Sequence, residues 1–400
     1  MITNRELFEL IVDTVPQWFI SENEATYKIK INLNGEEYYI SAFRNATPEL
    51  YSWLDKCSSL SSDLVMKNNT YSKFTDKQLI QSKLVLEWLK INNYEGEWDR
   101  IFDYSREMDC RTYENSTIGF TFIYDANSEG SIDIIANENQ KIIDVLAETH
   151  NTYFKLGKGW RFIDYNYVKA SELKTVTDYK LLPEFLFPYQ SVLKQGQCAI
   201  TKTKRGDLII YDIYGLIASN RKGQWKIYEP RALKNTLVDL LPGYYIGCNL
   251  FEVVFDLSYR RHGALILFDL EDNYKDVISN STSLLDGTGS SLHNALSNRL
   301  KEINVNKADN KIVSKQLLLE LASVDGALVF SNNGSLLAFG AIIKTHLNAK
   351  GEIGARSTAA LSAHYYGMRA FKISSDGEIV MYYDIVDEEG NKELIKIKFL

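Results

Sequence analysis

The last third of the chain alternates between helical and strand-like segments, and this alternation constrains the fold more than any other feature of the sequence. A helical run at 311–321 precedes the apolar run 328–330, and the turn signal at 332–334 leads into a second apolar run. A turn between two such runs is typical of a β-hairpin. Further strands are predicted at 368–373 and 379–383. We therefore predict a mixed α/β (α+β) fold, in which helices flank a mixed C-terminal sheet.

Upstream of this region, strand signals dominate. Alternating residues around Asn34-Gly35 predict a hairpin, and four short runs between 199 and 228 predict a meander. The 25 tyrosines and 18 phenylalanines also favour strands, where aromatic side chains are enriched. Capping boxes that begin at Thr3 and Thr75 predict two helices. We therefore expect a β-rich N-terminal region.

Proline and glycine suggest where the domains end. Pro183 and Pro188 bracket a poorly periodic aromatic segment, and Pro242-Gly243 follows a predicted helix. We predict an N-terminal β-rich α+β domain at 1–182, a connecting module of meander plus helix at 183–242, and a C-terminal domain at 243–400.

Charge and composition exclude several function classes. A net charge of −7 and a pI near 5.5 argue against general nucleic-acid binding and against an anionic membrane partner. No apolar run approaches the length that spans a bilayer, and charged residues interrupt the N-terminal segment. The four cysteines are far apart in the sequence, which indicates reduced structural thiols and a cytoplasmic protein; they are Cys57, Cys110, Cys198 and Cys248.

Two short motifs could bind a nucleotide. The first is Asp325-Gly326-Ala327, where the carboxylate could contact a nucleotide hydroxyl or a divalent metal. The second is a predicted helix start with glycine, arginine and two hydroxyls, which would favour phosphate; its residues are Gly354, Ala355, Arg356, Ser357 and Thr358. Taken singly, the first motif is more often a turn, and the second is as often a helix cap.

Other polar residues carry weaker signals. None of the five histidines has a partner at metal-ligand spacing, so a structural or surface role is the default. His364 follows Arg356 by about two turns on the same predicted helix, and it is a possible site residue. The Gly/Ser-rich loop at 286–291 is more often a linker than a phosphate loop. We predict no metal site.

The order of the motifs resembles the diadenylate cyclase (DAC) nucleotide-binding domain, in a divergent, sensor-like form. The resemblance covers about residues 245–385 and includes the segment 260–267, which is similar to the family's opening strand. Active members carry Asp-Gly-Ala, then Gly-Thr-Arg-His-Arg, then Ser-Glu-Glu-x-Gly. This chain keeps the first motif and the Gly354 and Arg356 positions of the second.

The metal-associated positions depart from that pattern. Ser357 stands where the family has histidine, and Thr358 stands where it has the second arginine. The third motif is one residue shorter, with Ser375 where the first glutamate is expected, and the neighbouring Asp376 is a possible site residue. A serine hydroxyl is a poor substitute for imidazole or carboxylate as a metal ligand.

The resemblance implies three alternatives within bacterial signalling. The first is a cytoplasmic sensor that binds ATP or a cyclic dinucleotide such as cyclic di-AMP without cyclising it, and which is then not an enzyme. The second is an active diadenylate cyclase, a homo-oligomer with Mn²⁺ or Mg²⁺ as cofactor and Asp325 as the catalytic residue. The third is a scaffold that binds no nucleotide. The sequence leaves ligand identity open.

Overall fold

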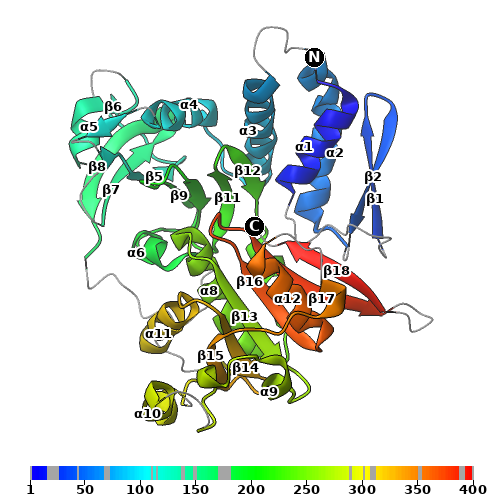
Figure 1. Cartoon of the computed structure of the whole chain (residues 1–400). Helices are drawn as coiled ribbons and strands as arrows, with labels where there is room; N and C mark the ends of the chain where they lie inside the picture. Colours follow the sequence, from blue (N-terminus) through cyan, green and yellow to red (C-terminus); the bar gives the residue numbers. More distant parts are fainter. Residues whose placement is uncertain are drawn as a thin grey trace. The chain divides into compact units, whose positions relative to one another are not determined.

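The computed structural model divides the chain into two compact units. The first comprises Met1–Ile20 and Ala25–Pro230, and the second comprises Ser21–Glu24 and Arg231–Leu400. The described residues are 2–15, 27–42, 45–66, 73–109, 111–113, 116–136, 140–146, 151–169, 182–287, 291–300, 302–306, 312–349, 354–386 and 392–398. Within them, helices and strands form mixed sheets flanked by helices, which confirms the predicted fold class (Figure 1).

The first unit begins with helices and one hairpin, so the described part of its first hundred residues is not β-rich. The helices are α1 (Asn4–Thr14), α2 (Pro48–Met66), α3 (Lys73–Ile91) and α4 (Trp98–Met108), and the hairpin is β1 (Tyr27–Leu33) with β2 (Glu36–Ala42). The capping box at Thr3 and the hairpin turn at Asn34-Gly35 are confirmed. The second capping box is wrong, because α3 already begins at Lys73 and Thr75 lies inside it.

The first unit then builds an eight-stranded mixed sheet in the order β12-β11-β10-β9-β5-β7-β8-β6. The strands are β5 (Phe120–Asp125), β6 (Ile132–Asp133), β7 (Thr152–Gly157), β8 (Arg161–Tyr167), β9 (Gln197–Lys202), β10 (Leu208–Tyr211), β11 (Leu216–Arg221) and β12 (Gln224–Ile227). Two short strands, β3 (Thr112–Tyr113) and β4 (Ser116–Thr117), pair separately. The pair β5–β7 is parallel, and α5 (Gln140–Leu146) lies between these strands in the chain.

The structure differs from the predicted three-domain division. The strands predicted as a connecting module are β9 to β12, and β9 pairs directly with β5 of the preceding region. The segment between the two prolines is not a linker: it forms η5 (Glu184–Leu186) and α6 (Phe187–Ser191), with Gln190 buried and donating to the Asp212 carbonyl. The units divide at Pro230, within α7 (Pro230–Leu240), and not at Pro242.

The second unit contains a six-stranded sheet in the order β15-β14-β13-β16-β17-β18. Its strands are β13 (Ala264–Asp269), β14 (Ala327–Ser331), β15 (Leu336–Ala341), β16 (Met368–Ile373), β17 (Ile379–Val386) and β18 (Lys392–Lys398). Its helices include α8 (Tyr244–Arg260), α9 (Tyr274–Val277), α10 (Ser291–Leu300), α11 (Ile312–Ala322) and α12 (Ala355–Tyr365). The predicted hairpin at 332–334 is confirmed, and β18 forms one edge of the sheet.

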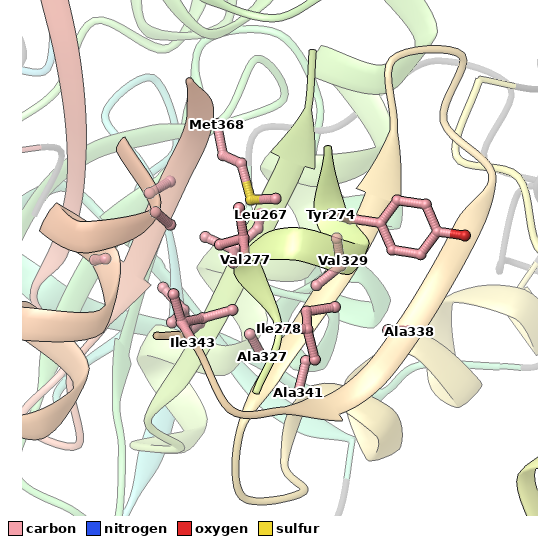
Figure 2. Close-up of a cluster of buried hydrophobic side chains, with 14 of the residues drawn as sticks. Leu267, Tyr274, Val277, Ile278, Ala327, Val329, Ala338, Ala341, Ile343 and Met368 are labelled. Atoms are coloured by element: carbon pink, nitrogen blue, oxygen red, sulfur yellow. The ribbon is translucent and has the colours of Figure 1, made fainter. Parts of the chain in front are cut away.

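The core of the second unit lies on both faces of the sheet. On one face, small and aliphatic side chains such as Leu267, Val329 and Met368 pack together, and Ala360 and Ala363 of α12 join them (Figure 2). On the other face Phe268 stacks on Phe330, with ring centroids 5.4 Å apart. Helices α8 and α11 contact the sheet as well. Since the side chains of β13 and β14 are buried on both faces of the sheet, a ligand could reach these strands at their ends.

Candidate functional site

Arg356 lies across the starts of two parallel strands. Strands β13 and β14 run in register with Leu265 opposite Ala327, so Gly263 and Asp325 fall side by side just before the strands begin. The Arg356 guanidinium Nη2 is 3.8 Å from Asp325 Oδ1. A Cβ on residue 263 would collide with that guanidinium, so only glycine leaves the arginine room at this position. The structure thus brings together Asp325 and Arg356 from two separate motifs.

Both charged groups remain open to solvent. The Asp325 side chain is fully exposed and that of Arg356 is 43% exposed. An exposed ion pair at this distance does little for stability. The guanidinium therefore keeps donors for an anion, and the carboxylate can accept from a hydroxyl group.

Gly326 and Ala327 of the first motif have structural roles. Gly326 has φ +109°, and a Cβ there would collide with the backbone of Gly340 and Ala341 in the hairpin partner. Ala327 is buried and pairs with Leu265 and Ala341. Gly326 and Ala327 fix the path of the chain where it enters β14. Of the three residues of the motif, only Asp325 presents a side chain at the surface.

The second motif forms a helix start as predicted. Gly354 is the N-cap of α12 with φ +99°, and no side chain caps it. Thr358 turns its hydroxyl back to the Gly354 carbonyl, which its Oγ1 reaches at 3.1 Å. Ala355 is exposed and Ser357 is buried. Residues 350–353, which lead into this helix, lie outside the described part of the chain.

A lysine that sequence reasoning missed completes the site. Lys372 of β16 donates from Nζ to Ser357 Oγ at 3.1 Å and to Glu378 Oε2 at 3.5 Å. Lys398 of β18 lies 3.9 Å from the other oxygen of Glu378. The register of β13 with β16 sets Lys372 opposite Leu265, on the face that α12 covers. The approach of Lys372 to Ser357 depends on how α12 packs on β16, so no local sequence pattern points to it.

Ser375 and Asp376 lie in the exposed turn between β16 and β17, at the same end of the sheet. Arg261 donates to the Asp376 carbonyl, and Ser258 of α8 donates to the Gly377 carbonyl, so α8 fixes the turn. The Asp376 carboxylate faces the backbone N–H of Glu378 at 3.4 Å. The Ser375 hydroxyl and the Asp376 carboxylate are therefore near the strand ends that carry Lys372 and Glu378.

His364 lies elsewhere. It is eight residues beyond Arg356 on α12, or about 12 Å along the helix axis. Its Nε2 is 2.7 Å from Asp384 Oδ1, near the opposite end of β17. The structure does not bring His364 to Asp325 and Arg356.

The apolar and aromatic side chains next to the two motifs do not flank a base beside Arg356, and these are Leu328, Phe330 and Tyr366. Leu328 and Phe330 are buried in the sheet. Tyr366 follows the last turn of α12 and contacts His346, with ring centroids 5.0 Å apart. It lies at the opposite end of α12 from Arg356.

Three further observations concern the described residues outside this site. Within the described residues, no cluster of three or more His, Cys, Asp or Glu side chains is arranged to hold a metal ion. None of the helices that the structure describes is both long and apolar enough to cross a bilayer. Cys57, Cys198 and Cys248 are buried and form no disulfide, and burial raises the pKa of the Cys57 and Cys198 thiols. Cys110 is outside the described residues.

No family model and no curated protein matches the chain. Among solved structures, the chain is similar to a hypothetical membrane spanning protein from Bacillus cereus, at 18% identity over 41% of this chain and 74% of that one, with a TM-score of 0.26. It is also similar to a double mutant of DacA from Staphylococcus aureus, at 18% identity over 38% of this chain and 85% of that one, with a TM-score of 0.24.

Proposed function

We propose that the second unit binds a nucleotide or cyclic dinucleotide at the starts of β13 and β14, and that it reports occupancy without cyclising the ligand. The observation that carries this proposal is the Arg356 guanidinium, which lies over Gly263 beside the exposed Asp325. Arg356 would bind a phosphate through its planar donors, and Asp325 would accept from a ribose hydroxyl.

Lys372 supports binding over catalysis. The Lys372 ammonium donates to Ser357 and Glu378. Ser357 stands at the position where the DAC family, which the sequence resembles, has a metal-associated histidine. Glu378 already faces two lysines. A fixed ammonium can neutralise phosphate charge, but it cannot activate a hydroxyl group as a bound Mg²⁺ or Mn²⁺ would. The same site is thus suited to hold a phosphate and poorly suited to transfer it.

The resemblance to the DAC domain is the source of the ligand class. Under this proposal the protein is a cytoplasmic bacterial sensor with reduced thiols, and homo-oligomer formation is not required for its action. The alternative, an active cyclase, requires two sites that face each other in an oligomer and a divalent metal. Asp376 or Glu378 would then replace the missing carboxylate.

The decisive experiment measures binding and product formation on the same full-length preparation. ATP and cyclic di-AMP are titrated separately by calorimetry, and ATP with Mn²⁺ or Mg²⁺ is incubated and analysed for cyclic dinucleotide. We expect binding without product. Arg356→Ala should weaken binding by about 10- to 100-fold, which is the loss expected for a charge-assisted hydrogen-bonded pair.

Arg299→Ala is the matched control, since Arg299 is an exposed arginine on α10 of the same unit. It should leave binding unchanged. Product that disappears in Asp325→Ala would make the protein a cyclase and would overturn the proposal. Absence of both binding and product would leave the scaffold alternative.

A further inference from the structure

The first unit contains a polar cavity that plays no part in the site described above. It has a volume of about 230 Å³ and lies between helices α3 and α4 and the strands β9 to β12. Every residue that lines it belongs to the first unit. The cavity therefore needs no contribution from the nucleotide site.

One row of the sheet forms the floor of this cavity. Lys202 pairs with Leu208, Leu208 with Asn220, and Asn220 with Trp225, across four successive antiparallel strands. Residues paired directly across strands share a face of the sheet, so all four side chains point to the side that α3 and α4 cover. The row thus places an ammonium, an amide and an indole side by side under two helices.

The lining is rich in positive charge. It includes four cationic side chains and one carboxylate, namely Arg106, Lys202, Arg205, Lys222 and Asp109. The adjacent Asp207 does not cancel this excess, since it is buried 4.0 Å from Arg221. Helix α4 supplies Arg106 near its end, and the two hairpin turns of the meander supply Arg205 and Lys222.

Lys202 is the central cation. Its side chain is only 4% exposed, with Nζ 2.6 Å from Asp109 Oδ1 and 3.0 Å from the Gly206 carbonyl. A desolvated ammonium forms strong hydrogen bonds to phosphate oxygens. Its partner Asp109 is 49% exposed and can turn to solvent when an anion replaces it. Ion pairs account for Lys202 with Asp109 and for Arg106 with Asp103, but these two pairs do not explain why Lys222 and Arg205 are also placed around the same space.

We propose that this cavity binds a small phosphate ester. The phosphate would lie against Lys202 and Lys222, and the organic group would rest on the apolar floor of Trp225 and Phe102, whose rings are 4.6 Å apart. The volume falls below the roughly 300–1,000 Å³ of sites for drug-sized ligands, so the attached group is compact and a whole cyclic dinucleotide is excluded.

The test titrates glycerol 3-phosphate, inorganic phosphate and glycerol into the full-length protein by calorimetry. We expect glycerol 3-phosphate to bind, glycerol not to bind, and inorganic phosphate to bind more weakly because it leaves the apolar floor unused. Lys202→Gln should weaken the binding of glycerol 3-phosphate at least tenfold, and Lys222→Asn should weaken it about threefold to tenfold. Asn is chosen because Lys222 has φ +52° in an exposed turn, where asparagine is tolerated.

Two controls separate this site from others. Lys194→Gln changes an exposed lysine of the same unit that does not line the cavity, and Arg356→Ala removes the proposed nucleotide contact; both should leave the binding of glycerol 3-phosphate unchanged. If the wild type does not bind the ester, if both lysine variants bind it as the wild type does, or if inorganic phosphate binds equally well, the proposal is overturned. Should Lys202→Gln fail to fold, as judged by circular dichroism, Lys222→Asn alone decides.

Discussion

The two large sheets share an arrangement but differ in how the ends of their central strands are filled. Each has one parallel pair flanked by antiparallel strands, β5–β7 in the first unit and β13–β14 in the second. Near the end of β5, the rings of Trp98, Tyr124 and Trp160 contact one another, with ring centroids 4.3 to 5.8 Å apart. At the start of β13 and β14 stand two glycines and an exposed arginine. Aromatic filling stabilises one sheet, whereas small residues leave the strand starts of the other open to solvent.

Removal of an aromatic ring from the first unit should have the largest effect on stability. Trp98 is buried and its indole N–H donates to the Tyr94 carbonyl at 2.9 Å. Trp98→Ala should lower the free energy of unfolding by about 3–5 kcal/mol, because it leaves a cavity and an unpaired carbonyl. Urea denaturation, monitored by circular dichroism, measures this change in the free energy of unfolding. Tyr167→Ala, at an exposed strand position, should cost less than about 1 kcal/mol, and equal costs for both variants would contradict the comparison.

In the second unit the glycines should be the sensitive positions. Gly326→Ala combines a positive φ with a collision against Gly340 and Ala341, so we expect a loss of about 3 kcal/mol. Gly287 is the matched control, since it has φ +95° with open space around its added Cβ. Gly287→Ala should cost about 1 kcal/mol. Denaturation curves of the two variants distinguish a steric collision from backbone strain. If Gly326→Ala lowers the free energy of unfolding no more than Gly287→Ala does, the close approach of Gly326 to Gly340 is refuted.

A buried carboxyl, that of Glu229, makes the stability of the first unit depend on pH. Burial raises the pKa of Glu229 to about 7, against a hydrogen bond from Thr47 and with a contribution from Glu49. The folded state thus holds the proton more tightly than the unfolded state. The free energy of unfolding should therefore fall as pH rises from about 4.5 to about 7.

Glu229→Gln removes this titration. The variant should be more stable than the wild type at pH 8 by about 2 kcal/mol, after allowance for partial solvent screening, and the difference should shrink toward pH 5. Thermal unfolding at a series of pH values measures it. Parallel pH profiles for the two proteins would show that Glu229 does not titrate in this range.

The features that the sequence predicts correctly are those that depend on a few neighbouring residues. The hairpin turn at Asn34-Gly35 and the helix start at Gly354 depend on neighbouring residues, and both form as expected. Helix α2 was missed although Leu50, Trp53 and Leu54 follow helical spacing, because serines and acidic residues interrupt its apolar pattern. The site residues Asp325 and Arg356 followed from the order of motifs. Lys372 did not, because its contact with Ser357 requires the packing of α12 on β16.

The outermost strand of the six-stranded sheet has a consequence for solubility. β18 forms one edge of this sheet, and its sequence carries lysines at three of its seven positions, 392, 396 and 398. An open strand edge invites another chain to add a strand, which is how aggregates begin. Repulsion between the lysines of two such edges opposes this pairing. The same ammonium group of Lys398 that faces Glu378 thus also helps to keep neighbouring molecules apart.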